Sequence, residues 1–465
     1  MNNFESVARE LITKLNLVLP RGQVVADPDV LKGYSHDHAG LVEWGTPSVL
    51  VRPRSTRDVQ AAMRIATQLN VPVVPRGAGS GLAGGANAVD GCIVLCLEQM
   101  NRIQMIDASA MIAIVEPGVI NGDLKAASSA AGLWYSPDPA SYEFSTIGGN
   151  VATNAGGLCC VKYGVTRDSL LGLKVVLADG TELHTGSQAR KSVAGLDLTS
   201  LFTGSEGTLG IITEVTVRLR PPPSHSSTLV AFFASLTNAG RAIVSIVSSH
   251  VPAMLELMDQ VTIRAVEQWK PMGLDTGAAA LLLASSDSAS DELASIEASC
   301  TDAGATYIAS TTSAEEGEHF MNARRLAYPA LERQGATLLD DVAVPIDKIV
   351  PTLSSIQHIA EQYGIKIGTF GHGGDGNLHP TIVFDPLSQS HLAQDAFNAI
   401  IKYVLDNGGT ITGEHGVGIL KAPYLAAEVG PESLQIQQGI KALFDPNHLL
   451  NPGKVLGSVI PPMAS

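Results

Sequence analysis

The sequence has little charge, few cysteines and no long hydrophobic run. Charged residues make up 16% of its 465 positions, against roughly 25% in typical soluble domains, and 45 acids face 30 bases. The net charge of −15 argues against nucleic-acid binding and against a polybasic membrane anchor. No stretch approaches the ~18 apolar residues of a transmembrane helix, and the first twenty residues lack the pattern of a signal peptide. Together these absences predict a cytoplasmic protein.

The cysteines form no C-x-x-C pair and no metal-type array. They are Cys92, Cys96, Cys159, Cys160 and Cys300. An odd number of them in a long chain predicts reduced thiols. Their spacing also excludes an iron–sulfur cluster bound by this chain alone.

Glycine is the residue in excess: 46 of them make up about 10% of the chain, against a usual ~7%. Five fall within Gly77–Gly85, where Gly79, Gly81 and Gly84 match G-x-G-x-x-G. A Rossmann loop would open a helix, whereas this one leads into another strand, so that assignment fails. A glycine-rich backbone can still wrap a diphosphate with its N–H groups. The alternative is a flexible surface loop.

The same signature recurs downstream, where small residues and hydroxyls stand beside glycine pairs. The segments are Ser145–Asn150, Asn154–Gly157 and Gly204–Ile212. Several such loops on one strand-rich region predict the binding of a long, phosphate-bearing ligand. Pro221–Ser224 then forms the clearest linker in the chain, and we expect a domain boundary there.

A predicted hairpin carries two histidines. Strands at Ile365–Phe370 and Pro380–Phe384 flank a Gly-Asp-Gly-Asn turn, with His372 and His379 at its two mouths. Antiparallel neighbours lie ~4.5–5.5 Å apart at Cβ, so both imidazoles could reach one metal ion. Asp375 fits a turn residue better than a ligand. The alternative is that both histidines are solvated loop residues.

Glu414 and His415 stand side by side between glycines. If the segment is extended, their side chains point to opposite sides. Glu414 could then complete a site of two histidines and one carboxylate, while His415 faces a substrate. Zinc hydrolases use such trios as well, so hydrolysis stays open as an alternative.

These loops and motifs, in this order, resemble the FAD-linked D-2-hydroxy-acid dehydrogenases. This branch of the vanillyl-alcohol oxidase and p-cresol methylhydroxylase (PCMH) type flavoproteins includes the glycolate oxidase FAD subunit and D-lactate dehydrogenase. The resemblance runs from about Tyr34 to Lys454. It implies an α+β protein with a two-subdomain PCMH-type FAD-binding domain over residues 1–222. A substrate-binding cap domain with an antiparallel sheet and the metal site then covers 223–419, and residues 420–465 return to the FAD domain.

The resemblance also implies which residues bind FAD. They are Arg76, Gly77, Ala78, Gly79, Ser80, Gly81, Leu82, Gly84, Pro137, Ser145, Thr146, Gly148, Gly149, Asn154, Gly156, Gly157, Gly207, Ile212 and Asn451. Some relatives carry a flavin-linking histidine in the first loop. Ser80 and its neighbours include none, so the FAD is expected to be non-covalent.

In the same family the metal ligands fall on His372, His379 and Glu414, and the catalytic base on His415. Zinc is the expected metal, with manganese or iron as alternatives. An arginine that grips the substrate carboxylate falls on Arg324. The alternative for Arg324 is a solvated ion pair on a helix rich in glutamate. Asp341 also matches, and we expect it to be structural.

The implied reaction is the oxidation of a small D-2-hydroxy acid, D-lactate or glycolate, to the 2-oxo acid. D-2-hydroxyglutarate or another larger D-2-hydroxy acid is the alternative, although its enzymes use a lysine and an asparagine where this chain has Leu339 and Thr381. The electron acceptor could be a quinone, a cytochrome, an electron-transfer flavoprotein or a partner subunit. We expect a homodimer or a complex with an iron–sulfur subunit, and such a partner could hold the chain peripherally at the inner membrane. A catalytically silent flavin subunit is a further alternative.

Overall fold

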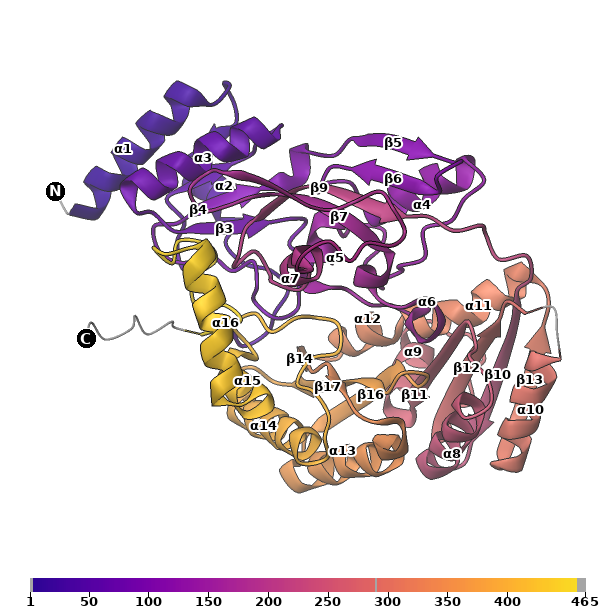
Figure 1. Cartoon of the computed structure of the whole chain (residues 1–465). Coiled ribbons are helices and arrows are strands. Elements are labelled where there is room, and N and C mark those ends of the chain that lie inside the picture. Colours follow the sequence, from indigo (N-terminus) through magenta and orange to yellow (C-terminus); the bar gives the residue numbers. More distant parts are fainter. Residues whose placement is uncertain (1–2, 289–290, 458–465) are drawn as a thin grey trace. The chain divides into compact units, whose positions relative to one another are not determined.

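The computed structural model describes residues 3–288 and 291–457, and the chain divides into two compact units (Figure 1). The first unit contains the chain up to Ala155, Val165–Pro222, and the chain from Glu414 onward. The second contains Gly156–Gly164 and Pro223–Gly413. The short segment Gly156–Gly164, called the excursion below, thus belongs to the second unit although the residues on both sides of it belong to the first. The chain enters the second unit again at the proline-rich linker and leaves it at Gly413 rather than near residue 419.

The first half of the first unit is a small, mostly parallel sheet in the order β1-β2-β4-β3. Its strands are β1 (Val24–Val25), β2 (Val49–Val51), β3 (Val73–Arg76) and β4 (Ile93–Cys96), and its helices are α1 (Asn3–Val18), α2 (Pro28–Lys32) and α3 (Thr56–Leu69). The strands are continuous apolar runs, as expected when both faces are buried. No helix follows β3 before β4, as the rejection of a Rossmann loop predicts.

The second half of the first unit is a five-stranded antiparallel sheet in the order β5-β6-β9-β7-β8. The strands are β5 (Ile103–Asp107), β6 (Ile112–Val115), β7 (Leu170–Val176), β8 (Glu182–Gly186) and β9 (Ile211–Arg218). The helices are α4 (Asn121–Ala130), α5 (Ile147–Thr153), α7 (Leu198–Phe202), and the C-terminal α15 (Ala422–Val429) and α16 (Pro431–Phe444). The C-terminal segment packs into this unit, because Leu450 joins the core of the first half and Phe444 that of the second.

The second unit is built on one large sheet in the order β13-β10-β12-β11-β16-β17-β14, with β15 also on β17, and every pairing is antiparallel, as predicted. Its strands are β10 (Ser227–Phe233), β11 (Met254–Asp259), β12 (Ala280–Ser286), β13 (Ala305–Thr311), β14 (Ala336–Leu339), β15 (Val342–Ala343), β16 (Lys366–His372) and β17 (Asn377–Phe384).

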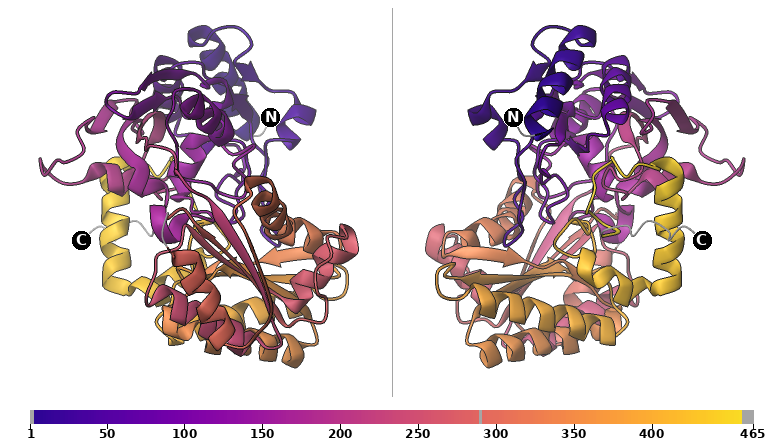
Figure 2. Two further views of the ribbon diagram at one scale, coloured as in Figure 1. Left: turned by 90° about the vertical axis from the view of Figure 1, so that its right-hand side faces the viewer. Right: turned by 90° about the vertical axis from the view of Figure 1, so that its left-hand side faces the viewer.

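Helices cover both faces of this sheet (Figures 1 and 2). One layer contains α10 (Glu292–Asp302), α8 (Leu236–Val247), α13 (Ile349–Tyr363) and α14 (Ser390–Asp406). The other contains α9 (Gln260–Trp269), α11 (Ala314–Arg325) and α12 (Ala327–Glu332). The short α6 (Cys160–Tyr163) belongs to the excursion into this unit. Over the described residues, we find no helix long and apolar enough to cross a membrane.

The chain around Pro329 forms two helices. Helix α11 ends at Arg325 and α12 begins at Ala327, so that Pro329 falls in the first turn of α12. The first turn tolerates proline because its N–H groups have no partner within the helix. Helix α10 begins only at Glu292, because Ser286 is still paired in β12.

Phe397 offers a test of the packing beneath the large sheet. Its side chain on α14 is fully buried, so Phe397→Ala should lower the free energy of unfolding by about 3–5 kcal/mol. Leu387 in the same unit is 95% exposed, and Leu387→Ala should change the free energy of unfolding by less than ~0.5 kcal/mol. Urea denaturation followed by circular dichroism measures both, and equal losses would contradict this packing.

Candidate active site

The predicted histidines lie on one face of the large sheet. His372 ends β16 and His379 lies in β17, and alternation places them on the same face as Gly368. A Cβ on Gly368 would meet Leu331 of α12 and Thr262 of α9, so this is the face covered by α9 and α12. The hairpin is therefore real, and both imidazoles project from the same side of it.

The two histidines are diagonal neighbours rather than direct partners. His379 stands opposite Phe370, and His372 stands opposite Asn377. Diagonal positions are farther apart at Cβ than opposed ones, but long side chains still meet across them. The imidazole rings meet edge to face, with centroids 5.1 Å apart and ring nitrogens within 4.8 Å of each other. Both are at least 95% buried, so they are not solvated loop residues.

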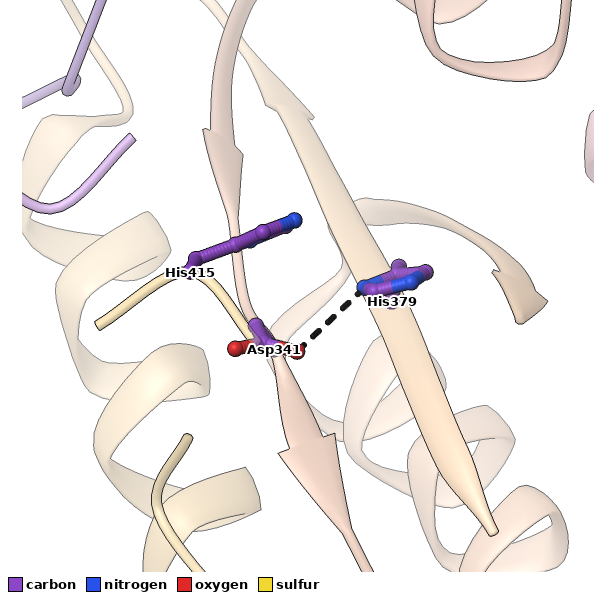
Figure 3. Close-up of side chains that lie close together, drawn as sticks. All are labelled: Asp341, His379 and His415. Carbon is purple, nitrogen blue, oxygen red and sulfur yellow. Dashed lines mark ion pairs between the residues drawn. The ribbon is translucent and has the colours of Figure 1, made fainter. Parts of the chain in front are cut away.

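Each imidazole lies beside a buried carboxylate. Glu256 of β11 faces His372 across the sheet, and its Oε1 lies 2.7 Å from His372 Nδ1. Asp341, between β14 and β15, has its Oδ1 3.6 Å from His379 Nδ1 (Figure 3). At His372 the carboxylate favours a proton on Nδ1, which puts the lone pair on Nε2, the state that a metal needs, whereas the Asp341–His379 contact is longer than a hydrogen bond. Sequence reasoning missed Glu256 altogether.

Arg324 is buried on the same face. Its side chain is 5% exposed, its guanidinium lies over the Phe370 ring at 4.7 Å, and its Nε forms an ion pair with Glu256 Oε2 at 2.6 Å. The surface ion pair belongs instead to its neighbour, since Arg325 contacts the exposed Glu318. Arg324 is therefore not the solvated ion pair of the alternative, and the cost of burying its guanidinium is offset by Glu256.

Asp341 also anchors the segment that leads to Glu414. Its Oδ2 accepts hydrogen bonds from the Thr412 hydroxyl at 2.8 Å and from the Gly413 N–H at 3.0 Å, and its Oδ1 accepts from the Asn377 amide at 2.8 Å. Gly413 is the last residue of the second unit, and the peptide bond to Glu414 is the covalent link. Asp341 therefore fixes the end of the second unit at Gly413, the residue immediately before Glu414.

Glu414 and His415 do not alternate as an extended strand would. The segment around them is bent and contains no strand, with Gly416 at φ +89° and Gly418 at φ +52°. His415 Nε2 lies 3.7 Å from Glu414 Oε1, so the two side chains converge instead of pointing to opposite sides. The expectation of opposite sides is thus wrong, because glycine bends the chain here.

A second buried carboxylate holds the far end of this segment. Glu206 Oε1 accepts a hydrogen bond from the Val417 N–H at 2.7 Å, and its Oε2 accepts one from the Gly418 N–H at 3.0 Å. Burial raises the pKa of Glu206 to about 7 against these hydrogen bonds. The sequence reading of Gly204–Ile212 considered its glycines and overlooked this acid.

The glycine-rich loop has the backbone groups of an anion cradle. Among the described residues, no hydrogen bond occupies the backbone N–H of any residue from Ala78 to Gly85, although Gly79 and Gly84 are buried. Buried N–H groups normally have partners, so this loop fits a ligand with several acceptor oxygens, such as a diphosphate. The Arg76 guanidinium packs against the loop so closely that a Cβ on Gly79 would collide with it.

The other predicted loops pack closely against one another and against β3. A Cβ on Gly77 would lie 2.4 Å from the Thr146 hydroxyl, and a Cβ on Gly207 would lie 2.2 Å from Pro75. The Asn451 amide donates to the carbonyls of Gly85 and Glu206, which ties the C-terminal segment to two of these loops. These glycines are therefore required for loop packing, whatever else they bind.

Several of the remaining candidate FAD-binding residues stabilise the local fold. Thr146 caps α5, and the N–H groups of Gly148 and Gly149 already donate to Pro117 and Thr146, so a cofactor would have to use other atoms there. Asn154 ends α5 in the left-handed conformation. Pro137, Ser145 and Ile212 are buried in the first unit, the more open Ser80 and Leu82 lie in the glycine-rich loop, and Gly156 and Gly157 begin the excursion into the second.

Comparison with known proteins identifies the family of this chain. Residues 47–186 match the family model of an FAD binding domain, and residues 222–455 match the C-terminal domain of FAD-linked oxidases. The chain belongs to the FAD-linked oxidases. It is therefore an oxidoreductase with an FAD-binding domain, and the hydrolase alternative is excluded.

Individual proteins that are similar to this chain in sequence or in fold are consistent with this family. The chain is 42% identical to a glycolate oxidase subunit GlcD of Bacillus subtilis, with 91% of each chain covered. It is 33% identical to a D-lactate dehydrogenase of Anaerostipes hadrus, with 97% of this chain and 98% of the relative covered. The fold is similar to that of p-cresol methylhydroxylase, with a TM-score of 0.82, 18% identity and 98% of each chain covered. The predicted PCMH-type fold is confirmed.

The raised pKa of Glu206 predicts a pH-dependent stability. Its pKa rises from 4.5 to about 7 on folding, so the contribution is full below pH 4.5 and is lost as the pH rises through 7. Glu206→Gln does not titrate. The unfolding free energy of the wild type minus that of the variant should therefore fall by about 3 kcal/mol between roughly pH 4 and pH 8. Urea titrations across this range measure the difference, and a constant value would refute the assignment.

Proposed function

We propose that the chain oxidises a small D-2-hydroxy acid, D-lactate or the related glycolate, to the 2-oxo acid, with non-covalent FAD and a divalent metal. The observation that carries this proposal is the buried Arg324 beside two carboxylate-backed imidazoles on one sheet face of an FAD-linked oxidase. Similarity to a glycolate oxidase subunit and to a D-lactate dehydrogenase supports the substrate class.

Arg324 and His415 have separate roles in the proposed oxidation. Arg324 grips the substrate carboxylate, and His415 accepts the proton of the hydroxyl group, a task suited to an imidazole near neutral pH. FAD held by the glycine-rich loops would supply the hydride acceptor. We assign FAD binding to residues 1–222 with the C-terminal segment, and substrate binding to the second unit.

The donor set fits a divalent metal. His372 and His379 lie close together with carboxylates at their Nδ1 atoms, and Glu414 follows directly after the anchored Gly413. Two imidazoles and one carboxylate suit zinc, manganese or iron. A metal held by these three residues would supply Lewis acidity at the substrate hydroxyl.

The nearby sheet surface favours a monocarboxylate. Leu339 of β14 stands opposite Thr381 of β17, two residues beyond His379 on the same face. Thr381 is fully buried and its hydroxyl donates to the His379 carbonyl at 3.4 Å. Neither residue offers a charge to a second carboxylate, so a dicarboxylate would be desolvated there at a cost of several kcal/mol.

The electrons leave for an acceptor other than NAD: a quinone, a cytochrome, an electron-transfer flavoprotein or a partner subunit. The chain has no cysteine array for its own cluster, and a relative is named as a subunit, which together support a complex with an iron–sulfur subunit. A homodimer is the alternative. We place the enzyme in the cytoplasm, with any membrane association made through the partner.

A substrate panel tests the proposal. Anaerobic, zinc-loaded protein is mixed with D-lactate, L-lactate, glycolate and D-2-hydroxyglutarate, and flavin absorbance near 450 nm is followed. We expect rapid bleaching by D-lactate or glycolate, slow or no bleaching by the dicarboxylate, and none by L-lactate. No bleaching by any of the four would refute the proposal and favour a catalytically silent flavin subunit.

Replacement of His415 tests its role as the base. His415→Ala should retain the yellow colour, because FAD is assigned to other loops, and should lose about 10²–10⁴-fold in the rate of flavin reduction. His391→Ala, on the exposed start of α14, is the matched control and should reduce flavin at the wild-type rate. A fast His415→Ala variant would mean that another group takes the proton.

A further inference from the structure

We propose that Glu256 is a positioning residue that sets His372 for the metal and Arg324 for the substrate carboxylate with one side chain. The inference rests on the function proposed above and assigns a residue that none of the sequence motifs contains. Its basis is geometric: each oxygen of one buried carboxylate lies against one of the two site residues. Glu256 itself would touch neither metal nor substrate.

The sheet register places Glu256 where it can serve both groups. Glu256 of β11 is paired directly with His372 of β16, so the two side chains stand side by side on one face. Arg324, near the end of α11, places its guanidinium over the Phe370 ring on the same face. Glu256 is 1% exposed, and water therefore cannot replace either contact. An ionised carboxylate in this position is retained only if both partners compensate for its desolvation.

The contact with His372 selects a tautomer. Glu256 Oε1 lies 2.7 Å from Nδ1, which keeps the imidazole proton on Nδ1 and the lone pair on Nε2. A metal can bind only the nitrogen that carries the lone pair. The same contact fixes the rotation of the ring, whose edge faces the His379 ring at 88°. Carboxylate, imidazole and metal in this order increase the basicity of the ligand.

The contact with Arg324 selects which guanidinium edge meets the substrate. Nε is paired with Glu256 Oε2 at 2.6 Å, and one flat face of the guanidinium is covered by the Phe370 ring. The two terminal nitrogens then form the edge presented to a substrate carboxylate. Such a fork binds both carboxylate oxygens and so fixes the orientation of the Cα–H bond.

A glutamine at position 256 cannot satisfy both partners. Glu256 accepts from His372 Nδ1 and forms an ion pair with the Arg324 guanidinium, whereas an amide has only one acceptor atom and no charge. If its oxygen faces Arg324, its NH₂ group faces His372 and favours the tautomer that blocks the metal. If its oxygen faces His372, the NH₂ group repels the Arg324 edge. Glu256→Gln should therefore weaken both sites while it preserves the shape of the side chain.

The experiment measures zinc affinity and steady-state kinetics on the FAD-loaded enzyme. We expect Glu256→Gln to raise the zinc Kd, measured against a chelating dye in the absence of substrate, by about 10–100-fold. We also expect the KM for D-lactate in zinc-saturated enzyme to rise roughly tenfold, with a smaller change in kcat. A purely structural role would lower the melting temperature and leave both constants unchanged.

Asp259→Asn is the matched control. Asp259 lies on the same strand, is also buried, and its two oxygens also accept from two donors, the N–H groups of Thr262 and Thr369. Its replacement should destabilise the protein in a comparable way without altering zinc affinity or KM. If Glu256→Gln does not fold, Glu256→Asp keeps both acceptors on a shorter stem and should weaken both constants to a smaller extent.

Unchanged zinc affinity in the folded Glu256 variants overturns the inference, and so does a wild type that binds no zinc. A change in only one of the two constants overturns the shared role. If the wild type oxidises none of the hydroxy acids, the proposed function fails, whereas the zinc measurement still decides whether Glu256 orients His372.

Discussion

The candidate site depends on buried carboxylates that bind parts of the protein rather than a ligand. Asp341 holds Thr412 and Gly413, and Glu206 holds Val417 and Gly418. The segment between these two anchors is only three residues long, Glu414, His415 and Gly416, and it contains a proposed ligand and the proposed base. Each anchor belongs to its own unit, so this segment also begins at the covalent link between the two units.

Local patterns in the sequence were enough to propose the groups that would perform chemistry. The glycine loops, the histidine hairpin and the Glu-His pair each stand out within about ten residues, because turns and hairpins are specified locally. The antiparallel sheet and the PCMH-type fold were likewise predictable. Local patterns did not predict the diagonal placement of His372 and His379, because the register of a hairpin depends on how its strands pair.

The residues that orient those groups could not be found in this way. Glu256 sits in a strand of ordinary composition and pairs with a histidine 116 positions later. Glu206 sits in a glycine motif and accepts from N–H groups 211 and 212 positions later. Contacts at such separations are created by tertiary pairing, and a single sequence contains no periodicity that reveals them. Only their burial and hydrogen-bond partners identify them.

The low charge of the chain and its excess of glycine have a common explanation. Its ligands are expected to be anions, yet acids outnumber bases by 45 to 30. The glycine-rich loop has backbone N–H groups from Ala78 to Gly85 without a hydrogen-bond partner among the described residues, and such groups would suit the proposed diphosphate without adding positive charge. The acids of the site point inward, to Nδ1, Nε and backbone N–H atoms, where each is balanced by donors. In the proposed reaction these carboxylates would orient the groups that hold metal and substrate without repelling the substrate, because the carboxylate oxygens already contact those groups.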